Sequence, residues 1–432
     1  MPARLRSLFA DTRPLENPHF RRLWTANIIT MIGAQLSVVA VPAQIYEITK
    51  SSAYVGLTGV FGLVPLVVFG LWGGALADAM DRRRLLLFTT SGMIITSGLF
   101  WLQAALGLNN VWLVLALFSI QQACFAVNQP TRAAVVPRLI PSPQLPAANS
   151  LNMTVFQFGG IAGPLVGGAL IPVVGLSWLY LIDTFCLLAT VWAVVKLPPL
   201  PPDTSTEGPA TSRMPGIRSV LEGLTYLRQH KVLLMSFVVD LIAMIFGMPR
   251  ALFPQVAHEN FGGPLAGGLA FALLFAAIPA GSVLGGIFSG WVSRVQRQGL
   301  AVIVCISIWG LAMVGFGLGI GFADPAAPTP MLTVAVLMLV LGGAADMASA
   351  AFRQSMLMDA ASDNVRGRLQ GVFTVVVAGG PRVADVAHGS VAALTGAAIA
   401  TAGGGAAVVV GVLLAAVLVP AFVRYRVGRT AD

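Results

Sequence analysis

Seven charged residues inside or at the edge of otherwise apolar runs are the first candidates for chemistry in this sequence. They are Asp183, Asp240, Arg250, Asp346, Arg353, Arg382 and Asp385. If these runs cross a membrane, a charge at the centre of a helix costs at least ~2.5 kcal/mol. Each residue is therefore expected to bind substrate, to carry a proton or to pair with an opposite charge. A carboxyl group in a semi-dry cavity can exchange a proton, and a guanidinium can recognise an anion.

Composition places these residues in a membrane protein. Of the 432 residues, 56% are hydrophobic and only 10% are charged, and the mean hydropathy is +0.83. A soluble domain is about a quarter charged, so this chain cannot cover a water-exposed surface. The 47 glycines and 27 prolines lie throughout the apolar runs, as is common in membrane helices. The sequence predicts an all-α polytopic membrane protein and excludes a soluble enzyme.

The apolar runs predict twelve transmembrane spans in two sets of six, since a helix needs about 20 residues to cross the hydrocarbon layer. The first set is expected at about 23–46, 53–79, 85–107, 111–131, 150–174 and 177–196. The second set is expected at about 233–254, 266–292, 299–322, 331–353, 370–396 and 400–423. We therefore expect an N-terminal six-helix bundle over 1–196, a cytoplasmic linker over 197–231 and a C-terminal six-helix bundle over 232–432.

The cationic residues predict the orientation. If both termini are cytoplasmic, 23 of the 26 Lys and Arg residues fall in inner segments, as the positive-inside rule requires. These charges are divided among short loops and form no single basic face, so no nucleic-acid partner is expected. The predicted location is the inner or plasma membrane, crossed many times.

The linker begins LPPLPP, a composition typical of an extended or disordered segment. Apolar residues then recur at helical spacing from Ile217 to Leu227. We expect 217–230 to form an amphipathic helix on the cytoplasmic membrane surface. The alternative is a plain connection between the two bundles.

No cofactor, resident metal or enzymatic activity is expected. The cysteines (Cys124, Cys186 and Cys305) and the four histidines lack ligand spacing. No G-x-x-x-x-G-K-[ST] loop is present, so ATP bound by this chain is not the predicted energy source. A membrane-embedded enzyme would need a cluster of His, Ser or acidic residues at an interface, and the sequence offers none.

A motif at the second-to-third connection recurs at the eighth-to-ninth. Gly74, Asp78 and Arg82 in GGALADAMDRRRLL are matched by Gly, Gly and Arg at the same spacing in GGIFSGWVSRVQRQG. A parallel six-plus-six duplication is typical of a secondary transporter whose two halves rock about a central site.

With these motifs the sequence resembles the major facilitator superfamily over essentially its whole length. The resemblance implies a cytoplasmic gate in which an aspartate caps a helix end of the other half and pairs with arginine. The residues at the positions of this gate motif are Gly74, Asp78, Asp81, Arg82 and Arg83. The chain departs from the family pattern at Ala79, where a base is usual, and at Asp81, where glycine is usual. A positive-inside anchor of arginines is the alternative role.

The fifth span carries GGIAGPLVGG. Its Gly159, Gly163, Pro164, Gly167 and Gly168 match the antiporter motif of the superfamily, which marks exporters rather than importers there. Small residues at this spacing also permit close helix packing, which is the alternative role.

Further stretches resemble the enterobactin-exporter branch of the superfamily. They are VAVPAQIYEITKSS, LLFAAIPAGSVLGGIFSGW, LPPLPP and GRLQGVFTVVVAGGPRVADVAHGS. Asp385 matches an acid at the same place in that branch. Members of the branch export siderophores or drugs such as macrolides, so the resemblance implies the direction of transport more than the substrate.

The resemblance also implies that the first, fourth, seventh and tenth spans line a cavity. Asp240 and Asp346 are then the best placed acids to bind a proton or a cationic substrate. Ion pairs, such as Asp346 with Arg353 or Asp385 with Arg382, are the alternative. The polar candidates on these spans are Asn27, Gln35, Gln44, Gln121, Gln122 and Asn128, and the candidates for anion recognition are Arg132 and Arg250.

We therefore expect a monomeric secondary active exporter of small amphiphilic molecules, driven by protons through alternating access. A siderophore and a multidrug range both remain open as substrates. A nutrient importer agrees less well with the antiporter motif. A non-transporting receptor would need a larger extramembrane domain than the longest loop, which spans about 35 residues.

Overall fold

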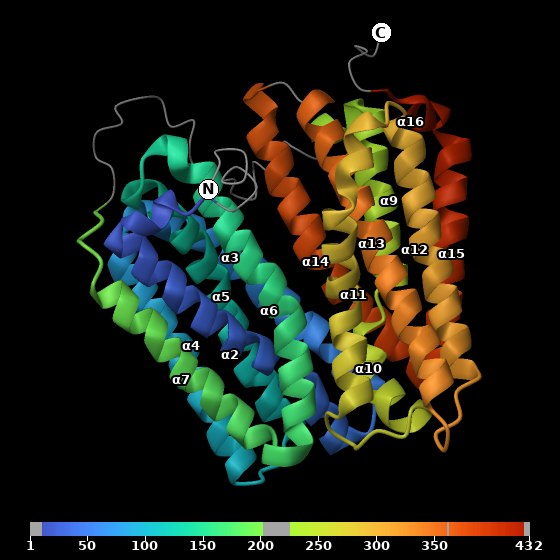
Figure 1. Cartoon of the computed structure of the whole chain (residues 1–432), viewed down its shortest axis with the longest axis horizontal. Coiled ribbons are helices and arrows are strands. Elements are labelled where there is room, and N and C mark those ends of the chain that lie inside the picture. Colours follow the sequence, from blue (N-terminus) through green and yellow to red (C-terminus); the bar gives the residue numbers. More distant parts are fainter. Residues whose placement is uncertain (1–10, 202–224, 361–362, 427–432) are drawn as a thin grey trace, which may run out of the picture. The chain divides into compact units, whose positions relative to one another are not determined.

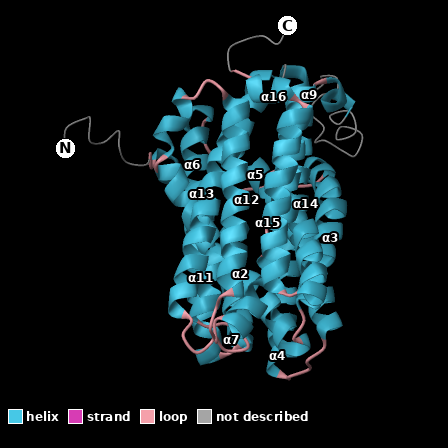
Figure 2. Ribbon diagram, turned by 90° about the vertical axis from the view of Figure 1, so that its right-hand side faces the viewer, coloured by secondary structure: helices cyan, strands magenta, loops and turns pink. Residues whose placement is uncertain are grey.

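Nearly every described residue lies in a helix. The computed structural model describes residues 11–201, 225–360 and 363–426. Figure 2 shows helices joined by short loops and no strand in these ranges. A helix satisfies its backbone hydrogen bonds internally, which is why so apolar a chain adopts this class of fold in a membrane. The prediction of an all-α polytopic protein is confirmed.

The chain divides into two compact units. Unit 1 comprises Met1–Val41 and Val64–Met214, and unit 2 comprises Pro42–Leu63 and Pro215–Asp432. The division passes through two long helices, so residues 42–63 pack with the second half of the chain. The six-plus-six division by spans stays a prediction about topology.

The described part of unit 1 contains six long helices around an apolar core. They are α2 (Pro18–Thr49, up to Val41), α3 (Ser52–Ala79, from Val64), α4 (Arg82–Ala105), α5 (Val111–Leu139), α6 (Leu145–Val174) and α7 (Leu176–Val195). Helix α4 packs against both α5 and α7 (Figure 1). Phe20, Leu86, Val135 and Leu151 are buried together in one of its apolar clusters.

Unit 2 holds the remaining long helices. They are α9 (Lys231–Gly247), α11 (Leu269–Ile287), α12 (Gln298–Gly321), α13 (Thr329–Ala360), α14 (Asp363–Thr395) and α15 (Ala397–Leu418), followed by the short α16 (Pro420–Arg424). Helix α12 packs against α13 and α15, α11 packs against α13, and α9 packs against α14 and α15. Figure 1 shows α9, α12, α13 and α15 running alongside one another.

The helices agree with the predicted spans. Eleven of the described helices are long and apolar enough to cross a membrane. Helix α14 falls on the predicted eleventh span but is more polar, because it carries Arg382 and Asp385. With α14 included, the structure is consistent with the predicted twelve.

The seventh span differs from its prediction. Instead of one helix over 233–254, α9 ends at Gly247. Pro249 lacks a backbone N–H and disfavours helical backbone at Met248, which accounts for the break. The chain then continues through short turns, namely a 3₁₀ turn (Arg250–Leu252), α10 (Phe253–Gln255) and a π turn (Val256–Asn260).

The linker is ordered where it begins. Leu197 and Leu200 are buried in the core of unit 1, so the segment is extended but not disordered at this point. Most of the amphipathic helix expected over 217–230 lies outside the described residues. Residues 225–229 are helical, and Leu227 is buried in an apolar cluster of unit 2. Leu227 therefore contacts protein rather than a membrane surface.

Candidate functional site

A buried ion pair joins α9 to α13. Arg353 Nη2 lies 2.8 Å from Asp240 Oδ1, and the two side chains are only 4% and 1% exposed. Arg353 also donates to the Ser349 hydroxyl, one turn earlier on α13, at 2.9 Å. The sequence singled out both charges but suggested Asp346 as the partner of Arg353. The structure pairs Arg353 with Asp240 instead.

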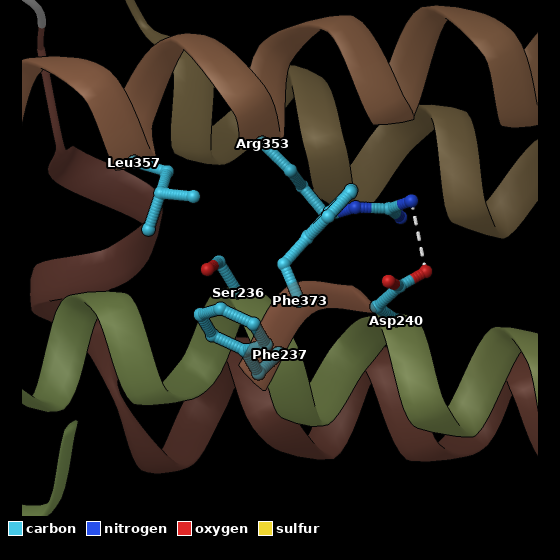
Figure 3. Close-up of a pocket in the computed structure, with 6 residues that line it drawn as sticks. All are labelled: Ser236, Phe237, Asp240, Arg353, Leu357 and Phe373. Atoms are coloured by element: carbon cyan, nitrogen blue, oxygen red, sulfur yellow. Dashed lines mark ion pairs between the residues drawn. The ribbon is translucent and has the colours of Figure 1, made fainter. Parts of the chain in front are cut away.

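A small cavity lies beside this pair (Figure 3). It is lined by Ser236, Phe237, Asp240, Arg353, Leu357 and Phe373. Its size is about that of one water molecule. It can therefore admit water or a proton carrier to the ion pair, but it cannot hold a large substrate.

Six of the seven predicted intramembrane charges gather in unit 2. Asp346 on α13 interacts electrostatically with Arg353 and Arg250. Asp385 on α14 interacts in the same way with Arg382 and Arg250. Unit 2 thus contains three of the predicted acids and three of the predicted arginines, of which Asp240 and Arg353 form a direct ion pair. No group of three or more His, Cys, Asp or Glu side chains in the described ranges is placed to hold a metal ion.

The seventh charge, Asp183, lies alone in unit 1. Its side chain is on α7 and is 1% exposed. Ser37 on α2 and Ser97 on α4 both donate to its Oδ2, at 2.7 and 3.0 Å. Its Oδ1 has no hydrogen-bond partner among the described residues. Hydroxyl groups, rather than a cation, surround this carboxyl group.

Polar contacts continue between α2 and α7. The hydroxyls of Thr30 and Thr190 lie 2.6 Å apart, and Thr30 also reaches the backbone oxygen of Cys186 at 3.2 Å. Arg132, from α5, donates to Asn27 and lies 3.4 Å from the Thr190 hydroxyl. Within unit 1 the Arg132 guanidinium is therefore held by neutral groups.

The remaining polar candidates mostly join helices. The Asn128 amide donates to Thr89 and Thr90 on α4, at 2.9 and 3.1 Å. Gln35 lies against Gly163 of α6. Gln121 and Gln122 are half-buried on α5. Bonds of this kind stabilise the bundle, and the sequence alone did not separate this role from substrate binding.

The antiporter motif packs α6 against α2. A Cβ on Gly159 would lie 2.6 Å from Met31 Cγ, and one on Gly167 would lie 2.8 Å from Val39 Cγ2. A Cβ on Gly163 would overlap with Gln35 Cβ, which is a still closer approach. The glycines thus permit the helices to approach, and α6 continues through Pro164 without a break. Gly168 is buried on the same helix.

The gate motif is described in part. The surroundings of Gly74 and of the Asp78 side chain are not among the described features. Asp81 caps α4 by accepting from the backbone N–H groups of Arg83 and Arg84, at 2.9 and 3.2 Å. An N-cap aspartate satisfies donors that have no partner inside the helix. The departure from the family glycine at this position therefore has a local structural role.

Asp81 also fixes the start of the linker. Its Oδ2 accepts from the backbone N–H of Leu200 at 3.1 Å, while the Leu200 oxygen accepts from the backbone N–H of Arg82 at 3.1 Å. Arg83 donates to the backbone oxygen of Val195, at the end of α7, at 2.8 Å. The motif and the linker are thus one hydrogen-bonded structure.

Sequence reasoning missed a polar cluster in unit 2. Tyr46, at the end of α2, donates to Glu259 at 2.6 Å, and Gln255 donates to Glu259 at 2.8 Å. Ser52, at the start of α3, donates to Gln255. Glu259 lies in the π turn that follows the broken seventh span. Pro249 was the available signal for that break, but no pattern in the sequence indicated which residue Glu259 would contact.

A family model of the major facilitator superfamily, described as transmembrane secretion effector, matches residues 9–426. The chain belongs to the transmembrane secretion effector family. It is therefore a multi-pass membrane transporter of the secretion, or export, type, and this family is not an enzyme class.

Curated relatives of this secretion-effector chain include the enterobactin exporters EntS of Escherichia coli O81 (strain ED1a) and Shigella boydii serotype 18. Each is 28% identical over 93% of this chain and 92% of its own length. Among solved structures, a mutant of the nucleoside transporter NupG is similar with a TM-score of 0.75 and 12% identity, covering 93% of this chain and 99% of NupG. A bacterial homologue of the lysosomal transporter Spinster has a TM-score of 0.70 and 15% identity, over 96% and 98%. These structures establish the fold alone.

Proposed function

We propose that the protein is a secondary active exporter of a catecholate-type siderophore, which exchanges its substrate for protons through alternating access. The observation that carries the proposal is the group of three acids and three arginines within the helices of unit 2. This group lies in a chain that is 28% identical, over 93% of its length, to enterobactin exporters.

The substrate class rests on the arginines as well as on the relatives. Arg250 and Arg382 are half-buried, and each interacts with Asp385. A guanidinium presents a planar set of donors that suits the paired oxygens of a catecholate or carboxylate. An arriving anion would compete with Asp385 for these two arginines, so substrate binding would change the charge balance of the unit.

Proton coupling is assigned to the acids of unit 2, and first to Asp240. Protonation of Asp240 would remove the charge that holds Arg353, and a buried arginine without a partner is costly. The ion pair is thus a switch with two distinct arrangements. The water-sized cavity beside it supplies the place where a proton carrier can enter.

The membrane orientation that we propose follows from the positive charges of the loops. We infer a monomer in the inner membrane, with both termini and the linker on the cytoplasmic side. A cysteine placed within 322–330 should react with a reagent applied from outside, and a cysteine at Arg83 should not. The reverse pattern would contradict this orientation.

The test is transport into inverted vesicles that contain the protein. A catecholate siderophore and a macrolide are compared while the proton gradient is followed with a dye. Siderophore uptake with loss of the gradient, and no response to the macrolide, is the expected result. A response to the macrolide alone would make the protein a drug exporter and overturn the substrate assignment.

Asp240→Asn tests the coupling. It should abolish gradient-driven uptake but still permit exchange of siderophore across the membrane. Thr333→Val is a matched control in the same unit, because the Thr333 hydroxyl bonds only its own helix backbone and is exposed. Uptake by Asp240→Asn with unchanged proton dependence would remove Asp240 from the coupling role.

A further inference from the structure

The carboxyl group of Asp183 is buried without a countercharge. Ser37 and Ser97 are its hydrogen-bond partners, and none of the described arginines or lysines pairs with it. A buried ionised carboxylate that lacks a cation costs several kcal/mol in desolvation. The surroundings of Asp183 therefore disfavour the charged form.

The hydrogen bonds have the asymmetry of a neutral carboxylic acid. Both serine hydroxyls lie within donating distance of Oδ2, and Ser97 shares its hydroxyl hydrogen between Oδ2 and the backbone oxygen of Tyr180 at 3.2 Å. Oδ1 receives no donor, although a carboxylate would share its charge between both oxygens. Oδ1, which receives no donor, is the oxygen to which we assign a proton in the proposal below.

The backbone of α2 covers this oxygen. A Cβ on Gly33 would lie 2.8 Å from Asp183 Oδ1 and 2.7 Å from Cys186 Cβ, so only glycine permits the helix to come so close. Water can reach Oδ1 from this side only if α2 moves away from α7. Access to the proton therefore depends on the packing of α2.

Helix α2 is also shared between the two units. Its residues up to Val41 belong to unit 1, and its residues from Pro42 belong to unit 2. The helix that closes over Asp183 therefore continues into unit 2. This arrangement connects the proton to the transport cycle.

We propose that Asp183, with Ser37 and Ser97, is a second proton-binding site of the exporter, located in unit 1 and separate from the Asp240–Arg353 pair. The proton is bound while α2 packs against α4 and α7. When α2 separates, the Oδ1–H bond breaks and the proton passes to water that enters. The role in transport rests on the proposed function, but the proton site itself does not.

The groups that face Asp183 are few. Helix α2 presents Gly33 and Ser37, and α4 presents Ser97. The titratable neighbours on α7 are Tyr180 and Cys186, which lie one turn to either side. Arg132 of α5 is bonded further along, at Thr190. Asp183 is therefore the acid that governs a pH response at this place.

Cys186 is a native probe for the separation of α2. A protein that keeps Cys186 alone (Cys124→Ala, Cys305→Ala) is labelled with a maleimide over a range of pH. Every thiol reacts faster with maleimide as pH rises. To correct for this, the labelling rate of Cys186 at each pH is divided by the labelling rate of Cys124 in a protein that keeps Cys124 alone. Cys124 is likewise half-buried in unit 1, against Gly92.

We expect the ratio of the Cys186 labelling rate to the Cys124 labelling rate to rise severalfold with pH. In Asp183→Asn the same ratio should stay low at every pH. An equal rise in Asp183→Asn, or no rise in either protein, would overturn the proposal. A ratio that follows sodium concentration instead of pH would make the oxygen cluster a metal-cation site and would also overturn it.

Ser97→Ala keeps the test decisive if Asp183→Asn does not fold. Loss of this hydroxyl donor disfavours the carboxylate, so the rise in labelling should move to higher pH. An unmoved rise would contradict the proposal. Thr96→Val is the matched control, because the neighbouring Thr96 hydroxyl bonds only the backbone of α4. The labelling experiment needs no substrate. If the protein does not export a siderophore, the labelling result still tests the proton site by itself.

Discussion

The two units each bury an aspartate in the middle of a helix bundle, and they compensate for it differently. Asp240 in unit 2 and Asp183 in unit 1 are both 1% exposed. Asp240 is paired with Arg353, whereas Asp183 is held by two serine hydroxyls. One carboxyl group keeps its charge by means of a cation, and the other avoids its charge by means of a proton.

This difference has a mechanical consequence. Breaking an ion pair exposes two charges at once, so the Asp240–Arg353 pair resists partial disruption and has two distinct states. A neutral acid costs little until its surroundings open, so Asp183 responds to helix packing. In the proposed mechanism, unit 2 exchanges substrate against protons and unit 1 responds to the position of α2.

The largest effect is expected from Arg353→Met. It leaves Asp240 buried without a partner, which should lower the free energy of unfolding by about 3–5 kcal/mol. The double variant Asp240→Leu with Arg353→Met should recover most of this loss, because both charges are then absent. Denaturant unfolding in detergent measures each change. Equal stability of the single and double variants would show that the pair is not a coupled unit.

A smaller effect is expected from Gly33→Ala, which tests the close approach over Asp183. The new Cβ would meet Asp183 Oδ1 and Cys186 Cβ, and overpacking of this kind costs about 1–3 kcal/mol. Gly98→Ala on α4 is the matched control, since nothing lies within 4 Å of its Cβ. The control should be neutral or stabilising by up to about 1 kcal/mol, because alanine is the better helix former. If both variants unfold alike, α2 does not cover Asp183 in the way described.

The smallest effect is expected from Asp183→Asn. The amide is neutral and can accept the same two hydroxyl donors, so the stability should change by about 1 kcal/mol or less. The same denaturant titration applies. A gain in stability of several kcal/mol would mean that Asp183 is ionised in the native chain, because the amide would then remove an uncompensated buried charge, and the contrast between the units would disappear.

Much of the fold follows from local patterns in the chain. Eleven of the predicted spans are apolar runs of sufficient length, and Asp81 before α4 is a residue type preferred at a helix N-cap. Pro249 likewise marks the place of the break after Gly247, although Pro164 lies within the continuous helix α6. These features depend on neighbouring residues and can be found without tertiary structure.

The sequence predicted which residues belong to the site but not which of them contact one another. The cost of charge in a membrane singles out Asp240, Arg353 and Asp183, but it does not assign their partners. Asp346 shares a helix with Arg353, yet the ion pair forms with Asp240 on a different helix. The serines around Asp183 come from α2 and α4, 146 and 86 residues away in sequence. Such contacts depend on helix packing, which no local spacing encodes.

The most direct test of the contrast between the units is infrared spectroscopy of the purified protein, which detects the carbonyl stretch of a neutral carboxylic acid. Spectra of the unaltered chain are compared with those of Asp183→Asn and of Asp240→Leu with Arg353→Met. We expect Asp183→Asn to remove a neutral carboxyl band and the double variant to leave this band in place. A band that survives in Asp183→Asn, or that is lost from the double variant, would contradict this expectation.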